Sequence, residues 1–162
     1  MKKKSKIPVE LFTDGAYDRG NKRGGNGGYG VVLLFGSRVK KIISSPYKRT
    51  SIFRMEIKAI IRALEEVGPG YDIYIYSDSK NAIDFINNKI IHLVALGQLH
   101  GYAESELWYR FLDVRRLHLQ EGSKISFSWV RSHNGNKYNE MADALAGEAA
   151  RNSSKIKCKT NN

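Results

Sequence analysis

The chain of 162 residues contains one cysteine, Cys158, so no disulfide can form within it. This excludes a small fold held together by disulfides and predicts a protein of a reducing compartment, the cytoplasm. The sequence also lacks Cys-x-x-Cys and His-Glu-x-x-His, and its four histidines are scattered. Without such spacing, no zinc site is expected.

Long apolar runs are missing as well. No stretch is long enough to span a membrane. The opening "MKKKSKIPVELF" has the basic residues of a secretion signal but not the apolar core that should follow them. A membrane partner is therefore not expected. The length fits one domain that can bury a core of its own, and there is no internal repeat or interdomain linker.

Acidic residues are absent from both ends, although the net charge of the chain is +11. Residues 1–6 contain four lysines, and residues 151–162 contain four basic residues. Between them, residues 7–150 carry 19 basic and 16 acidic residues, a surplus of only three. We expect a basic N-terminal arm (1–7), a folded domain (8–151) and a basic C-terminal tail (152–162). Such arms suit either a polyanionic partner or a solubilising role, and charge alone favours neither.

The pattern of apolar residues predicts strands that alternate with helices. The expected strands are 9–13, 29–35, 38–44, 71–77 and 124–130, and the expected helices are 53–67, 80–87, 104–119 and 137–151. A hairpin around Gly36-Ser37 makes the opening strands antiparallel, whereas the later alternation favours parallel pairing. The predicted class is α/β, with a mixed five-stranded sheet flanked by helices. In the helix 104–119 the expected apolar stripe is Leu107, Phe111, Val114 and Leu117.

The stretch "GNGGYG" (25–30) matches the dinucleotide-binding pattern Gly-x-Gly-x-x-Gly. That motif requires a helix after the glycines, and here the strand-like "VVLLF" follows instead. No Gly-Lys-Ser/Thr ending is present, so a Walker loop is excluded too. The glycines alone predict a flexible hairpin loop.

Two acids, Asp14 in "FTDG" and Asp78 in "YSDS", each follow a predicted strand that ends in Thr or Ser. If the two strands are parallel neighbours, both carboxylates leave the sheet at the same edge, where open sheets bind ligands. Adjacent strands lie ~4.8 Å apart, so these acids could share a cation. An aspartate after a strand is also a common turn or helix-cap residue.

Two further acids, Glu56 and Asp143, have equally ordinary explanations. Glu56 falls in the first turn of its predicted helix, where it would complement the helix dipole. Asp143 in "NEMADALAG" would be solvated helix surface. If the four acids converge, however, their mutual repulsion would favour bound cations.

Taken in order, five segments resemble the ribonuclease H type 1 family: "TDGA", the loop ending in "GGYG", "RMEIKAIIRALE", "YSDS" and "WVRSHNGNKYNEMADALA". The resemblance runs from about residue 8 to 151. It extends to the spacing between His133 and Asp143 and to Trp108 in "SELWYRF". Each segment alone is weak, but their order and separation are specific. The resemblance implies the ribonuclease H-like fold, with the first three strands antiparallel and the remainder parallel.

The resemblance implies that Asp14, Glu56, Asp78 and Asp143 hold two Mg²⁺ ions, with Mn²⁺ as an alternative. Together the ions would activate the attacking water and stabilise the leaving 3′ oxygen, so that the products carry a 5′-phosphate and a 3′-hydroxyl. His133 would assist proton transfer or product release from a mobile loop, "SHNGN". Taken alone, it would more often be a surface residue.

The implied activity is hydrolysis of the RNA strand of RNA–DNA hybrids by a monomer with no stable protein partner. The implied substrate contacts are Gly15, Ala16, Ser51, Arg54, Lys80 and Asn139. Two alternatives stay open: a junction resolvase built on the same fold, and a non-catalytic module that binds hybrids or duplexes. The spacing from His133 to Asp143 and the "GGYG" loop favour ribonuclease H, and the complete carboxylate set argues against the non-catalytic module.

Two segments depart from the family pattern. Ile52 and Phe53 occupy the positions where many members carry polar amides, so discrimination of the 2′-hydroxyl would shift to the backbone near Gly15 and Ala16. Residues 89–103, where bacterial members often have a basic, Trp-rich protrusion, contain a single lysine. We expect a short helix there, with its apolar side on the core. An apolar docking surface for a partner is the alternative.

Overall fold

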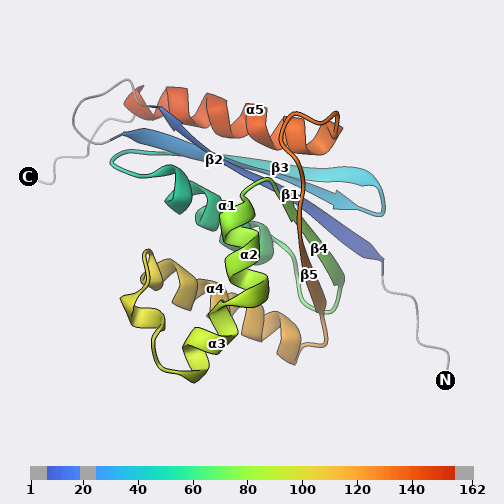
Figure 1. Ribbon diagram of the computed structural model, residues 1–162. Coiled ribbons are helices and arrows are strands. Elements are labelled where there is room, and N and C mark those ends of the chain that lie inside the picture. The colour runs from blue at the N-terminus through green and yellow to red at the C-terminus, as the bar shows by residue number, and fades with distance from the viewer. Residues whose placement is uncertain (1–6, 19–24, 156–162) are drawn as a thin grey trace, which may run out of the picture.

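A computed structural model describes residues 7–18 and 25–155 and shows a five-stranded sheet in the order β3-β2-β1-β4-β5 (Figure 1). The strands are β1 (Pro8–Asp18), β2 (Asn26–Phe35), β3 (Arg38–Tyr47), β4 (Asp72–Ser77) and β5 (Lys124–Trp129). The helices are α1 (Ile52–Glu66), α2 (Lys80–Asn88), α3 (Ile90–Ala95), α4 (Ser105–Gln120) and α5 (Lys137–Asn152), with short 3₁₀ helices η1 (Leu99–Gly101) and η2 (Ser153–Lys155). Strands β1 to β3 are antiparallel, and β4 and β5 are parallel to β1, which confirms the predicted class.

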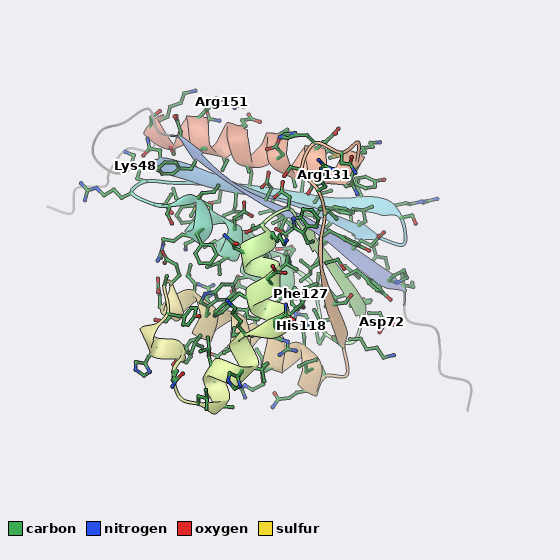
Figure 2. The ribbon with its side chains drawn as sticks, viewed as in Figure 1. Lys48, Asp72, His118, Phe127, Arg131 and Arg151 are labelled. Carbon is green, nitrogen blue, oxygen red and sulfur yellow. The ribbon has the colours of Figure 1, made fainter. Side chains whose placement is uncertain are left out.

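The two faces of the sheet are covered differently. Side chains alternate between faces along a strand. Phe12 and its neighbours Val32 and Leu34 pack with Ala142 of α5, whereas Leu11 belongs to the larger core on the other face. Figure 1 shows α5 alone on one side and α1 to α4 on the other. Figure 2 shows the same division: Phe127 lies on the side of α2 and α4, and Arg131 lies next to α5.

The glycine-rich segment is not the flexible loop that the sequence suggested. β2 begins at Asn26, and Gly27, Gly28 and Gly30 are buried residues within it. β1 in turn continues through Asp14 to Asp18, so Asp14 lies inside the strand rather than after it. The physical reason is close packing: a Cβ added at Gly28 would lie 2.5 Å from Ala149 of α5. Gly28 and Gly30 thus let α5 approach the strand.

Helix α1 begins at Ile52 because the side chain of Ser51 accepts a hydrogen bond from the backbone N–H of Arg54 and caps the helix. Glu56 is therefore in the second turn, not the first, and its side chain is buried. Its proposed role as a partner of the helix dipole was wrong. Burial of this acid needs another explanation.

The apolar stripe of α4 is confirmed at Leu107 and Phe111 but is wrong at its end. Leu117 is 57% exposed, and the neighbouring His118 is buried instead. His118 Nε2 donates to the Leu64 carbonyl oxygen at 2.8 Å, which joins α4 to the end of α1. The imidazole thus fills an inward position for which periodicity favoured an apolar side chain.

Residues 89–103 form α3 and η1, and only part of their apolar surface reaches the core. Ile90 and Leu99 are buried, as expected for a short helix that packs on the core. Ile91, Val94 and Leu96 are about half exposed. The predicted inward-facing side is therefore present, with a second apolar side exposed to solvent.

No helix within residues 7–18 and 25–155 has the length and apolar character to cross a membrane. Residues 1–6 and 156–162, which contain most of the two expected basic arms, lie outside the described residues. Residues 152–155 complete α5 and form η2, where Ser153 is buried.

Candidate active site

Two of the predicted acids meet at one edge of the sheet. β1 and β4 are parallel neighbours, and Thr13 pairs with Ser77, so the following residues, Asp14 and Asp78, lie side by side. Glu56 joins them from α1. One carboxylate oxygen from each of the three acids lies within 4.8 Å of the others. The predicted convergence of these three side chains is present.

Gly15 brings α1 to this edge. A Cβ at Gly15 would lie 2.6 Å from the backbone nitrogen of Glu56 and 2.8 Å from the carbonyl carbon of Met55. Any side chain there would push the helix away from the strand. The absence of one lets Glu56 reach Asp14.

Asp143 approaches from the opposite layer. It is half-buried on α5, and its charge is one of those that raise the pKa of Asp14. Gly30, the partner of Asp14 in β2, allows this approach because a Cβ at Gly30 would lie 2.3 Å from the Ala142 carbonyl oxygen. Asp143 therefore lies close enough to Asp14 to affect its pKa but stands outside the tight group of three acids.

The site strongly disfavours its own negative charge. Burial, followed by the charges of Asp78 and Asp143, raises the pKa of Asp14 from 3.8 to about 8. Burial, together with the charges of Asp14 and Asp78, raises the pKa of Glu56 well above its ordinary value. Asp14 Oδ1 accepts a hydrogen bond of 2.8 Å from Gly15 N–H, which offsets only part of this cost.

These residues fit a divalent cation. Within the described part of the chain, Glu56 Oε2 is buried without a hydrogen-bond partner, which is costly unless something else satisfies the oxygen. Carboxylate oxygens are the ligands that Mg²⁺ and Mn²⁺ prefer, and a cation would remove the repulsion that raises both pKa values. The unsatisfied oxygen and the paired acids therefore support a metal site.

The segment after β5 is attached to Asp78. Ser132 Oγ donates a hydrogen bond of 2.8 Å to Asp78 Oδ2, and Trp129 Nε1 donates one of 3.0 Å to the Asp78 carbonyl oxygen. His133 follows directly, exposed and with a left-handed φ of 51°. Sequence reasoning missed Ser132, since nothing in a polar loop sequence indicates which residue a serine in it will contact.

Comparison with known proteins identifies the family of this chain. The family model described as RNase H matches residues 6–151.

The chain belongs to the ribonuclease H family.

Curated relatives agree with this assignment. The chain is 40% identical over 147 residues to the ribonuclease H of Syntrophus aciditrophicus (strain SB), covering 88% of this chain and 80% of that protein. It is 33% identical over 144 residues to the ribonuclease HI of Synechocystis sp. (strain ATCC 27184 / PCC 6803 / Kazusa), covering 89% of this chain and 88% of that one.

Solved structures share the fold. LC9-RNase H1, described as a type 1 RNase H with the type 2 active-site motif, superposes with a TM-score of 0.69 at 22% identity, covering 94% of this chain and 76% of that chain. A foamy viral protease-reverse transcriptase in complex with dsDNA gives a TM-score of 0.73 at 19% identity, covering 89% of this chain and 94% of that chain.

The residues expected to contact a ribonuclease H substrate are not equally available. Lys80 is exposed, 6.0 Å from the centre of the Trp129 ring, and Ala16 is half-buried near Gly15. Asn139 is 2% exposed, and its buried Oδ1 has no hydrogen-bond partner among the described residues. Ser51 uses its hydroxyl to cap α1.

Arg54 is already engaged by acids. Its guanidinium forms ion pairs with Glu104 and Glu106 at the start of α4. These contacts, above all that with Glu106, raise its pKa. A phosphate would have to compete with two carboxylates for this side chain.

Proposed function

We propose that this chain is an endoribonuclease that hydrolyses the RNA strand of RNA–DNA hybrids with two Mg²⁺ ions, Mn²⁺ being able to replace them. The observation that carries the proposal is the group formed by Asp14, Glu56 and Asp78, whose oxygens lie within 4.8 Å of one another. Membership of the ribonuclease H family supplies the substrate class. No separate observation favours a junction resolvase or a non-catalytic binding module.

The four acids have distinct places in this mechanism. Asp14, Glu56 and Asp78 would hold the ions, and Asp143 would complete the site from α5 beside Asp14. When bound, the ions would supply Lewis-acid activation of water and charge stabilisation at the scissile phosphate. A water oxygen forms a bond to phosphorus as the P–O3′ bond breaks, which leaves a 5′-phosphate and a 3′-hydroxyl.

His133 is suited to moving a proton near this site. Its imidazole is exposed, and its backbone adjoins Ser132, whose hydroxyl contacts Asp78. We assign it proton transfer or assistance to product release, since general acid–base groups typically contribute ~10²–10⁴-fold. The left-handed φ of His133 belongs to a conformation that non-glycine residues adopt only when their surroundings enforce it.

Substrate binding is assigned to groups around the acids. We assign hybrid contacts to the backbone at Gly15 and Ala16, to the hydroxyl of Ser51 and to the exposed Lys80, as the family membership implies. Asn139 supports the site from within α5. Arg54 reaches a phosphate only if its ion pairs with Glu104 and Glu106 open.

A cleavage assay tests the proposal. Labelled RNA–DNA hybrid, duplex RNA, duplex DNA and junction DNA are each incubated with Mg²⁺, with Mn²⁺ and with a chelator. We expect cleavage of the RNA strand of the hybrid alone, with 5′-phosphate ends, and none with the chelator. Preferential cleavage of the junction would favour the resolvase, and tight hybrid binding without cleavage in any metal would favour the binding module.

We further infer a cytoplasmic monomer, on two grounds. The single cysteine suits a reducing compartment, and all four acids of the site come from one chain. Sedimentation at micromolar concentration should give the mass of one chain. A concentration-dependent dimer would contradict this part of the proposal.

A further inference from the structure

A small polar cavity lies apart from the carboxylates, on the face of the sheet covered by α1 and α4. Its volume is about 80 Å³. Two strands, β2 and β3, contribute Tyr29 and Tyr47 to its lining, and the helices contribute Lys58, Ile61, Arg62, Glu65, Leu107 and Arg110. Three cations thus face one acid in a hollow of a domain that is nearly neutral as a whole.

The single acid of the lining is already neutralised. Glu65 Oε1 accepts hydrogen bonds from Arg110 at 2.8 Å from Nε and 2.7 Å from an Nη nitrogen. The next acid on the helix, Glu66, pairs with Lys41 and, at 2.6 Å, with Arg62. These two acids and four basic side chains leave the surroundings of the cavity with two surplus positive charges.

Of the four basic side chains around the cavity, Lys58 is the one that forms no ion pair with a described acid. Its ammonium lies 4.6 Å from the centre of the Tyr47 ring, and among the described residues it forms no ion pair with a carboxylate. Lys58 is half-buried, so it has lost part of its hydration, and the ring face replaces that hydration only partly. An anion bound beside this ammonium would therefore stabilise it electrostatically.

The tyrosines supply a donor as well. The ring centres of Tyr29 and Tyr47 lie 5.8 Å apart, and Ser45 is the partner of Tyr29 in β3. Burial and the contact with Tyr47 raise the pKa of Tyr29, whereas the contact with Ser45 lowers it. Tyr47 lines the cavity, and its hydroxyl can donate a hydrogen bond to an anion there.

We propose that this cavity is a second anion site, which binds a phosphate group through the Lys58 ammonium, the Arg62 guanidinium and the Tyr47 hydroxyl. A tetrahedral oxyanion matches the combination of charged and neutral donors around a space of this size. Arg62 is six residues beyond Glu56 on α1, about 9 Å along the helix, so the site is separate from the metal-binding acids. The phosphate belongs either to the nucleic-acid backbone or to a free small anion.

Thermal unfolding in the presence of a chelator tests the site without metal and without cleavage. The melting temperature of the wild-type protein is measured in inorganic phosphate and in chloride at equal ionic strength, beside Lys58→Met and Tyr47→Phe. Lys137→Met is the matched control, because Lys137 also lies over a tyrosine ring, 5.7 Å from the centre of Tyr138, but on α5 away from the cavity.

At a phosphate concentration of ten times Kd, we expect the wild-type and Lys137→Met proteins to gain about 4 °C over chloride. Lys58→Met and Tyr47→Phe should lose most of that gain. Because Tyr47→Phe keeps the ring under Lys58, it tests the site even if Lys58→Met folds poorly. An equal gain in all four proteins, or none in the wild type, overturns the proposal.

Hybrid binding in chelator then identifies the source of the phosphate. If the cavity takes a backbone phosphate, Lys58→Met should lower the slope of log affinity against log salt by roughly 0.7–0.9, and Lys137→Met should lower it less. An unchanged slope, together with the phosphate-specific gain in melting temperature, assigns the site to a free anion.

Discussion

Ser132 Oγ donates a hydrogen bond of 2.8 Å to Asp78 Oδ2, and this bond joins the loop that carries His133 to one of the candidate metal ligands. A carboxylate has two oxygens, and in Asp78 one of them is oriented by a neighbour on another element. Partners of this kind fix the rotamer of a metal ligand and raise its effectiveness. The position of His133 is thereby coupled to the geometry of the acids.

Replacement of Ser132 by alanine should therefore weaken metal binding and activity by about tenfold, the lower end of the range for groups that orient metal ligands. Threonine keeps the hydroxyl and should restore most of both. Calorimetric Mg²⁺ affinity and kcat are measured for each variant. Ser126→Ala, on the exposed side of β5, is the control and should behave as wild type. Full affinity in Ser132→Ala would show that Asp78 needs no such partner.

The Asp14→Asn variant should lose hybrid cleavage by at least roughly 10³-fold while its metal-free form becomes more stable. The loss follows from removing a charged ligand at the point where the transition state is stabilised electrostatically. The gain follows because burial and the charges of Asp78 and Asp143 force Asp14 to take up a proton when the chain folds at neutral pH, and an amide carries no such cost. Cleavage rates and melting temperatures in chelator measure the two effects. A lower melting temperature than that of the wild type would contradict the conclusion that a charged Asp14 is costly in the folded protein.

The raised pKa of Asp14 also fixes how the metal-free protein responds to pH. Since that pKa is about 8 in the folded state and near 3.8 in the unfolded chain, the folded protein holds a proton that the unfolded chain has released. The stabilisation from this proton is complete below pH ~4 and is lost as the pH rises through 8. The melting temperature in chelator should therefore fall between pH 5 and pH 8.

Metal binding should release the same proton from Asp14. At pH 7 a divalent cation has to displace the proton of Asp14, so binding should release about one proton, and affinity should rise toward pH 8. Calorimetry in two buffers of different ionisation enthalpy counts the protons released. Asp14→Asn should release fewer, and equal heats in both buffers with the wild type would contradict the prediction.

Much of this architecture follows from pattern. The period of the apolar residues predicted the strands and the longer helices, and the repeated strand-Asp arrangement predicted that Asp14 and Asp78 would meet at one edge. Contacts between layers were invisible to the same reasoning. The left-handed Glu104 and its pairing with Arg54 join segments 50 residues apart, and no local pattern records such a pair.

The glycines show most clearly why local pattern was insufficient. A run rich in glycine favours a loop when only the backbone freedom of glycine is considered. In the folded chain Gly15, Gly28 and Gly30 are strand residues selected for their missing side chains, because helices on both faces come too close for a Cβ. That requirement belongs to the packed molecule, so a single sequence could not reveal it.

Replacement of Gly30 by alanine tests this role directly. The new Cβ would lie 2.3 Å from the Ala142 carbonyl oxygen and 2.8 Å from Leu145 Cβ, so α5 must move away from β2. Overpacking of this kind costs roughly 1–3 kcal/mol, which corresponds to a fall in melting temperature of about 2–12 °C. Because α5 carries Asp143, cleavage should fall further than the loss of folded protein explains, when kcat is measured well below the melting temperature. Gly101→Ala is the control, since no atom of the described residues beyond its chain neighbours lies within 4 Å of a Cβ there, and it should change neither quantity. A Gly30→Ala protein as stable and active as the wild type would show that the space between α5 and β2 can accept a methyl group. Close packing would then not explain the glycine opposite Asp14.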